Sequence, residues 1–441
     1  MIDALPSNVH QAVSHYLHRN DLIRLLYISK SVTDIWIGEV YRNHTFLFSR
    51  MHRQVPSYLK RVRRVRFDSN QVIQPNSLPP NLQYLILTDS YNQKIGTGIL
   101  PLSLRDLKFG YDYNQPIDPG VLPNGLRSLE FKNDSAYQTR YSWDHDNISP
   151  SACTYNQKIC IDILPPSLRS LKLGNTFDQI IDSDVLPPNL RSLELGDTFN
   201  QAIWPGVLPP NLRSLTFGNA FNRVIGPGVL PIGLRSLDLC DAFNQKLERG
   251  VLPIGLENLH LWGKYNHRLE RGVLPEGLRS LILGEKYRQL IEPGDLPEGL
   301  RYLRFVGDYK SYNQKLKAGA LPIGLQTLIL GHDYNQKIEP GVLPPNLQIM
   351  IFCEKYNQKL ELHTLPPDLQ TLEFGWHFNQ ALDPGVLPPN LQTLTLGREF
   401  VQKIEPGVLP PRLRTIMLCN KYPYIDDIRA VFSGQLWLKH N

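Results

Sequence analysis

The sequence predicts an α+β protein: a β-solenoid of about 15–16 units of 22 residues, with a single curved parallel sheet and a small all-α N-terminal module. Two observations predict this fold. A Leu-Pro pair recurs fifteen times from Leu78 to Leu409, and twelve of the fourteen intervals between these pairs are 22 residues long. The first fifty residues lack this repeat and space their apolar residues as helices do.

The composition agrees with a repeat array. Length alone would suggest about two to three domains, but a periodic chain folds as one continuous array, so the repeat overrides that expectation. Apolar residues make up 41% of the chain and charged residues 20%, which is enough to bury a large core. The 36 prolines exclude a chain of mainly long helices, because each proline removes a backbone donor.

One unit, residues 186–207, shows how a repeat is expected to fold. Leu190, Leu193 and Leu195 form an L-x-x-L-x-L core, and the last two alternate with polar residues as in a half-buried strand. Pro and Gly mark turns on both sides and leave no room for a helix of ordinary length. A unit this short cannot close a core alone, so we expect its leucines to be buried between stacked units.

Comparison of the units separates fixed from variable positions. An aromatic residue follows each strand and usually precedes Asn-Gln, which predicts an aromatic spine and an asparagine ladder that caps backbone groups. Lys and Glu beside the buried Ile or Leu are expected to form a solvated face. We interpret a further column as a structural ladder rather than an anion-binding edge; it comprises Arg105, Arg127, Arg169, Arg191, Arg213, Arg235, Arg279, Arg301 and Arg414.

The aromatic-Asn-Gln-x-Ile-x-Pro-Gly segment, joined to Leu-Pro-Pro-x-Leu, resembles the FNIP repeat, a short relative of leucine-rich repeats. The resemblance covers about residues 55–420, with an insertion at about residues 133–153. It implies a leucine-rich-repeat-like solenoid that binds proteins and catalyses no reaction. After Leu418 the leucine pattern breaks, and residues 421–441 are expected to form a partly helical C-terminal cap.

Residues 1–50 resemble an F-box. Val9, Val13 and Leu17 share one helical face, and Asp21 can cap a second helix. An F-box beside an FNIP array is a recurrent pairing in that family. The resemblance implies docking on a Skp-type adaptor of a cullin ligase, through Leu5, Pro6, Val9, Val13, Leu17, Asp21, Leu22 and Leu25.

Together the two resemblances imply a substrate-recognition adaptor of a Skp–cullin–F-box type E3 ubiquitin ligase. The alternative left open is a non-catalytic interaction scaffold or host-factor decoy, in which residues 1–50 only cap the first open coil. The sequence contains no phosphate loop, nucleophile elbow or zinc-ligand spacing, so we expect no enzyme activity, cofactor or metal.

Target binding is expected on outward-facing strand residues of the concave face, where side chains vary beside a constant core. A contiguous apolar and aromatic patch is predicted there, because exposed patches of this kind usually mark contacts. Its residues are Ile282, Tyr302, Arg304, Ile329, Ile349 and Ile351, with His260 and Trp262 at one border. The insertion is a second candidate, through Tyr137, Tyr141 and Trp143.

The sequence also bears on location. No apolar run approaches the ~20 residues of a membrane span and no secretory signal is visible, so we expect no membrane partner. The net charge of +6 defines no partner class, and we expect no nucleic-acid partner. Five scattered cysteines indicate reduced thiols. We therefore expect a cytoplasmic protein, with the nucleus as an alternative. If the protein is viral, the cytoplasm is that of the host.

Overall fold

The computed structural model describes residues 45–51, 59–132, 153–307 and 311–439. The chain divides into two compact units, Met1–Leu190 and Arg191–Asn441, which we call the first and second unit and describe separately. Residues 1–44 of the helical module predicted from the sequence lie outside the described residues. Residues 133–152 of the insertion also lie outside them.

The first unit contains one short helix and six short strands among its described residues. The helix is α4 (Phe48–Met51), directly after the first strand. The strands are β1 (Thr45–Leu47), β2 (Arg64–Phe67), β3 (Tyr84–Leu87), β4 (Asp106–Phe109), β5 (Ser128–Phe131) and β6 (Ser170–Lys172). Each strand pairs in parallel with the next along the chain, so this unit is a β-solenoid.

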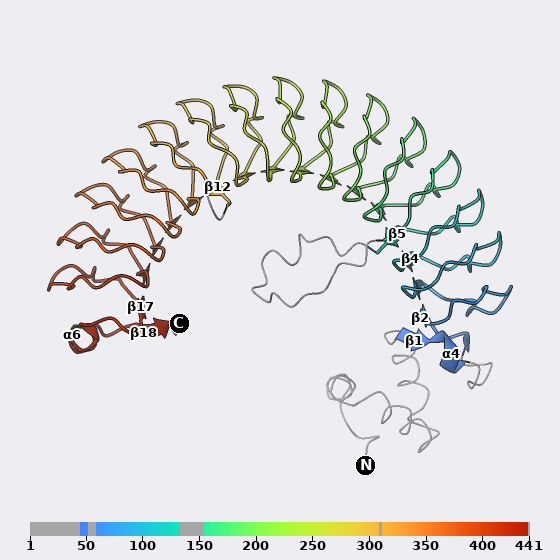
Figure 1. The fold of residues 1–441 in the computed structure, drawn as a ribbon, viewed down its shortest axis with the longest axis horizontal. Helices are drawn as coiled ribbons and strands as arrows, with labels where there is room; N and C mark the ends of the chain where they lie inside the picture. The colour runs from blue at the N-terminus through green and yellow to red at the C-terminus, as the bar shows by residue number, and fades with distance from the viewer. Residues whose placement is uncertain (1–44, 52–58, 133–152, 308–310, 440–441) are drawn as a thin grey trace, which may run out of the picture. The chain divides into compact units, whose positions relative to one another are not determined.

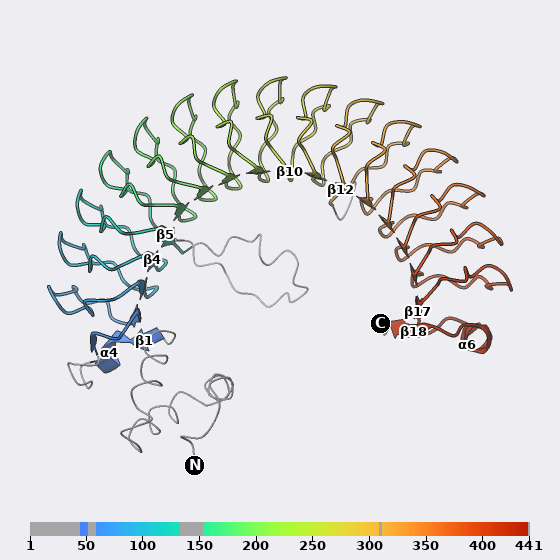
Figure 2. The same cartoon turned by 180° about the vertical axis from the view of Figure 1, so that it is seen from behind.

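The second unit continues the pattern with strands that line the inner side of its arc (Figure 1), also in the view from behind (Figure 2). Its strands are β7 (Ser192–Glu194), β8 (Ser214–Thr216), β9 (Ser236–Leu239), β10 (Asn258–Leu261), β11 (Ser280–Leu283), β12 (Tyr302–Phe305), β13 (Thr327–Ile329), β14 (Ile349–Ile351), β15 (Thr371–Glu373), β16 (Thr393–Thr395), β17 (Thr415–Cys419) and β18 (Gln435–Lys439). Helix α6 (Ile425–Val431) lies between the last two strands.

The sequence-predicted parallel solenoid with 22-residue repeats is confirmed. Strand partners lie one repeat apart, as in the pairing of Ser192 with Ser214. Along most strands, buried and half-buried residues alternate, and the buried ones are the leucine positions such as Leu193 and Leu215. The leucines of neighbouring repeats therefore share one core beneath the sheet.

A spine of aromatic rings forms the second layer of this core. In the second unit, Tyr312, Tyr334 and Tyr356 follow one another with ring centroids 6.3 Å apart and nearly parallel planes. Tyr422 continues the stack beyond Phe400, at 5.8 Å. In the first unit, burial raises the pKa of Tyr91 to about 12, because the ionised phenolate would lie among apolar neighbours.

The asparagine ladder predicted from the sequence is also confirmed. The Asn335 Oδ1 atom accepts a hydrogen bond from the backbone N–H of Asn357 at 2.9 Å and another from the Gln358 side-chain amide at 3.1 Å. The backbone bond of this pattern also joins Asn200 to Asn222 in the second unit and Asn92 to Asn114 in the first. The ladder therefore satisfies backbone donors that a turn would otherwise leave unpaired.

The C-terminal segment extends the sheet as well as adding a helix. Strand β18 pairs in parallel with β17, with Thr415 opposite Gln435 and Cys419 opposite Lys439. Helix α6 buries Ile428. The open coil of β17 is thus covered by a further strand, as solenoid ends require.

The aromatic spine predicts the effect of shortening one ring. Tyr334→Ala would remove a fully buried ring between two stacked neighbours, so the chain should lose about 3–5 kcal/mol of stability. Tyr334→Phe should cost less than about 1 kcal/mol, because Phe occupies this position in other repeats, as Phe378 does. Urea unfolding of the full chain, followed by circular dichroism, measures both, and equal losses would contradict a packing role for the ring.

Candidate functional site

The open face of the second unit carries two rows of side chains. The first and third residue of each strand are half-buried at most positions, while the residue between them is buried in the core. Most repeats place Ser or Thr in the first row, as at Ser214 and Thr371. The second row varies from Glu194 to Met417, so it carries the chemical differences of this face.

The strand register brings the predicted patch together in the second row. Ile282 pairs with Arg304, Arg304 with Ile329, and Ile329 with Ile351, on four consecutive strands. Adjacent strands lie about 4.8 Å apart, so neighbouring side chains in this row are within contact reach. We call Ile282, Tyr302, Arg304, Ile329, Ile349 and Ile351 the concave patch.

The structure corrects two details of the predicted patch. In the first row, Thr327 lies between Tyr302 and Ile349, and in the second row Arg304 lies between Ile282 and Ile329, so apolar residues pair directly only at Ile329 and Ile351. Trp262, expected at the border, is only 8% exposed, and Ile282 is 9% exposed. Trp262 follows strand β10 in a column that holds Cys240 and Gly284 in the neighbouring repeats, and its ring packs edge-on to the His260 ring. It therefore packs into the scaffold and is not an exposed anchor.

Charged residues flank the concave patch along the second row. His260 forms an ion-pair contact with Asp238, and both side chains are about one quarter exposed. Beyond the other end of the patch, Ile351 pairs with Glu373. The second row therefore has an acidic position beyond each end of the patch and Arg304 within it. The other predicted site residues, in the F-box-like module and at Tyr137, Tyr141 and Trp143, lie outside the described residues.

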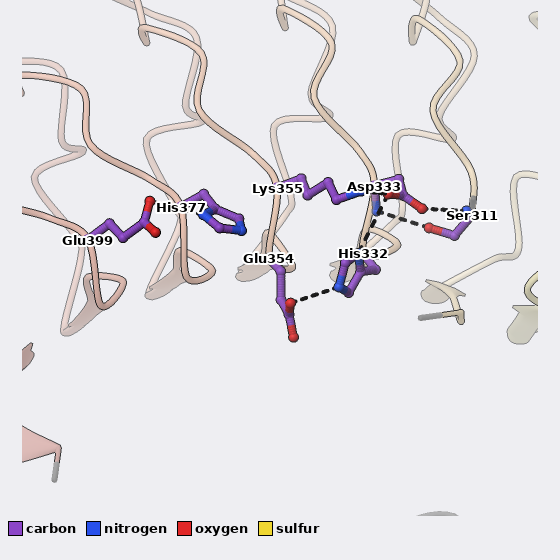
Figure 3. A network of polar contacts seen from close by, with 7 residues as sticks. All are labelled: Ser311, His332, Asp333, Glu354, Lys355, His377 and Glu399. Carbon is purple, nitrogen blue, oxygen red and sulfur yellow. Dashed lines mark hydrogen bonds and ion pairs between the residues drawn. The ribbon is translucent and has the colours of Figure 1, made fainter. Parts of the chain in front are cut away.

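A polar network crosses the edge where the strands of the second unit end (Figure 3). Ser311 and Asp333 hold each other reciprocally: the Ser311 backbone N–H donates to Asp333 Oδ2 at 2.8 Å, and the Asp333 N–H donates to Ser311 Oγ at 3.0 Å. Ser311 directly follows residues 308–310, in the 25-residue unit that begins at Leu296. The contact therefore joins this longer loop to the next repeat.

Ion pairs extend the network across the following repeats. The Lys355 ammonium group bonds to Asp333, and His332 Nε2 lies 2.7 Å from a Glu354 carboxylate oxygen. Partial burial opposes ionisation of Asp333, but hydrogen bonds from Lys355 and the Ser311 backbone, with the Lys355 charge, hold its pKa below the ordinary value. Sequence analysis missed this network; its only signal is that Asp333 and Lys355 carry opposite charges 22 residues apart.

The network is better suited to joining repeats than to chemistry. A hydroxyl nucleophile needs a general base within hydrogen-bond reach, but the Ser311 hydroxyl oxygen is held by the backbone N–H of Asp333. Within the described ranges, no group of three or more His, Cys, Asp and Glu residues could hold a metal ion. In the same ranges, no helix has both the length and the apolar character that crossing a bilayer requires.

The hydrogen bonds of the arginine column support its interpretation as a structural ladder. Arg105 Nη1 donates to the Gly125 carbonyl oxygen at 3.0 Å, and Arg279 Nη1 donates to that of Gly299 at the same distance. Each guanidinium group therefore reaches the turn of the following repeat. At these two positions the cation is engaged by backbone oxygens.

The polar network predicts a pH-dependent contribution from Asp333, whose side chain is 13% exposed. Asp333→Asn should lower stability by about 1–3 kcal/mol at pH 7, because it weakens hydrogen bonds to a charged acceptor. A carboxyl group whose pKa is lowered in the folded state stabilises the fold at pH values above its ordinary pKa, which is about 3.9 for Asp. This stabilisation is lost as the pH falls through the lowered pKa. The two proteins should therefore converge in acid, as the pH falls through the lowered pKa of Asp333.

Thermal unfolding midpoints measured from pH 7 to pH 2 test this expectation. Asp383→Asn is the matched control, because Asp383 pairs with Lys359 at 2.9 Å but is 54% exposed, so its loss should change little. A difference between the Asp333 variant and the natural chain that persists in acid would argue against the assigned role.

Comparison with known proteins shows a repeat family and a fold. The FNIP Repeat family matches residues 70–112, 91–134, 155–198, 199–241, 243–286, 265–308, 287–333, 312–355, 334–377, 356–397 and 378–421. A comparison with curated proteins finds no match. Among solved structures, the chain is similar to CroV588, described as a novel circular LRR protein, with 28% identity, a TM-score of 0.50, and coverage of 91% of this chain and 72% of that one.

Two further solved structures are similar at lower identity. An internalin (inlF) from Listeria monocytogenes has 16% identity and a TM-score of 0.45, over 64% of this chain and 85% of that one. The mouse RP105/MD-1 complex has 16% identity and a TM-score of 0.47, over 84% of this chain and 66% of that one.

The eleven family matches span more than half of the 441 residues and coincide with the observed repeats. The chain therefore belongs to the FNIP repeat family.

Proposed function

We propose that this chain is a non-catalytic protein-binding subunit that holds a target protein on the strand face of its second unit. The observation that carries the proposal is the concave patch, where the half-buried Ile329 and Ile351 occupy a row that holds Glu or Thr in other repeats. Clustered apolar residues on an open surface are typical of protein contact sites.

The scaffold beneath the patch favours such a role. Backbone pairing, the leucine core and the aromatic spine hold these side chains in place before any partner arrives. A rigid surface loses little conformational entropy on binding, so more of the contact energy appears as affinity. Asp238 and Glu373 at the two ends of the row favour a target whose apolar segment is flanked by basic residues.

The finer proposal is that the chain is the substrate-recognition adaptor of a Skp–cullin–F-box type ubiquitin ligase. It rests on the resemblance of residues 1–50 to an F-box and on the presence of an FNIP array beside it. In this arrangement the N-terminal module docks on a Skp-type adaptor. The repeat face then raises the effective concentration of target lysines near the ubiquitin-loaded enzyme.

The target site is tested by adding charge to the concave patch. Tyr302→Glu, Ile329→Glu and Ile351→Glu together should reduce capture of the bound target at least about tenfold, because unpaired carboxylates would be buried in the contact. Glu occupies the same row naturally at Glu194, so the fold should tolerate the change. The control places Glu at Ser214, Thr216 and Ser236, on the same face outside the patch.

Capture is compared by quantitative mass spectrometry of proteins cross-linked to the natural chain and to both variants. The proposal requires a partner held by the natural chain and by the control but lost from the patch variant. Equal capture by all three folded proteins would remove the patch from the proposed function.

The ligase link is tested separately at the N-terminal module. Leu17→Ala, Leu22→Ala and Leu25→Ala together should abolish recovery of purified Skp-type adaptor and cullin, because these leucines are the expected apolar anchors. Circular dichroism of both forms reports whether the module still folds, and capture on the repeat face should be unchanged. If neither form recovers the adaptor, the chain is a scaffold or decoy whose first fifty residues act as a cap.

A further inference from the structure

Four glutamines interrupt the arginine column of the second unit. The residue just before each strand is Arg at Arg279 and Arg301, but Gln in the next four repeats, and Arg again at Arg414. The four residues are Gln326, Gln348, Gln370 and Gln392. They lie in consecutive repeats, so their side chains form one row beside the starts of β13 to β16.

The substitution opens the surface that arginine otherwise covers. An arginine extends over the turn of the next repeat, so closely that a Cβ added to Gly324 would lie 1.9 Å from Arg301 Nη1. A glutamine side chain is shorter and leaves that turn uncovered. The result is a groove of about 510 Å³, lined by the four glutamines and bounded by Arg301 and Arg412. We call it the glutamine groove.

The glutamine side chains in this groove make no hydrogen bond to any described residue, and those of Gln326, Gln348 and Gln370 are exposed. Other glutamines of the same repeats behave differently, since Gln358 and Gln380 donate to the asparagine ladder at 3.1 and 3.0 Å. The repeats thus carry one glutamine that is used by the scaffold and one that is not. The second kind offers a free donor and a free acceptor per repeat.

The opposite wall of the groove is held by internal contacts. Asn346 Nδ2 donates to the Ile323 carbonyl oxygen at 3.2 Å. Asn390 Nδ2 donates to Asp368 Oδ1 at 3.2 Å, and Arg412 Nη1 donates to Asn390 Oδ1 at 2.7 Å. Asp368 and Arg412 are thus joined through one amide, so the wall is fixed, and with Arg301 the groove lining carries one net positive charge. No aromatic or large apolar side chain lines the groove, which disfavours an apolar ligand.

The spacing of the row limits the kind of ligand that fits. The glutamines follow the strands at about 4.8 Å per step. An extended peptide presents backbone groups on one edge every second residue, about 6.7 Å apart, so it would lose register after one repeat. A linear chain of pyranose sugars advances by nearly one strand spacing per residue, and each hydroxyl both donates and accepts a hydrogen bond, as each amide does.

We propose that the glutamine groove binds a linear oligosaccharide, with one sugar unit at each of Gln326, Gln348, Gln370 and Gln392. Each side-chain amide bonds hydroxyl groups of one sugar, while the Asn390–Asp368 wall limits the width of the chain. This site lies beside the concave patch but is separate from it, since it uses turn residues and no strand side chain.

The test uses maltohexaose, cellohexaose and mannohexaose as probes, titrated into the full chain by calorimetry and by saturation-transfer NMR. Gln348→Arg with Gln370→Arg restores the side chain that most repeats carry, so this variant should fold and close the groove. At least one hexasaccharide should bind the natural chain and bind this variant at least about tenfold more weakly, because two amide contacts are lost.

Gln83→Arg is the matched control, because Gln83 holds the same repeat position in the first unit, far from the groove in sequence. It should bind the probe as the natural chain does. A neutral peptide of alternating serine and glutamine is titrated in parallel. Failure of all three sugars to bind, equal binding by the groove-closing variant, or groove-dependent binding of the peptide in place of sugars would each overturn the proposal.

Discussion

The register between successive repeats is the constraint on which the rest of the structure depends. Backbone pairing of Ser192 with Ser214 fixes it on the strand side, and the bond from the Asn222 N–H to Asn200 Oδ1 fixes it on the return side. A repeat can therefore change length only where neither set of bonds runs. Both lengthened units, with extra residues near 133–152 and 308–310, gain them between the strand and the aromatic residue. Strands β5 and β6 still pair in register across the first insertion.

Because the register is fixed, positions one repeat apart in sequence become neighbours in space. A substitution in one repeat changes a single point on a surface, whereas the same substitution in consecutive repeats makes a continuous feature. The isoleucines at positions 329 and 351 form an apolar row in this way, and the glutamines at positions 348 and 370 form a groove. These substitutions leave the core unchanged, since Leu328, Met350 and Leu372 beneath them stay fully buried.

Features that repeat along the chain could be predicted from the sequence, and features that depend on one pair of side chains could not. The strand, the leucine core and the asparagine ladder recur every 22 residues, so their contacts follow from the period. The burial of Trp262 does not follow, because it depends on how one large ring packs beside His260 in a column of small residues. The contact between Ser311 and Asp333 recurs in no other repeat of the part of the chain that the structure describes, so the period gives no sign of it.

The run of glutamines has an energetic consequence for the second unit. Each arginine that donates to the next turn, as Arg279 does to Gly299, stabilises the interface between two repeats by about 0.5–1.5 kcal/mol. Solenoid stability is a sum of such nearest-neighbour terms, so four consecutive glutamines weaken one stretch of the array. The exposed turn atoms and amides then bond to water, which a ligand can replace. A ligand that lies along the groove supplies, from outside, the bridging hydrogen bonds between repeats that the arginines supply elsewhere.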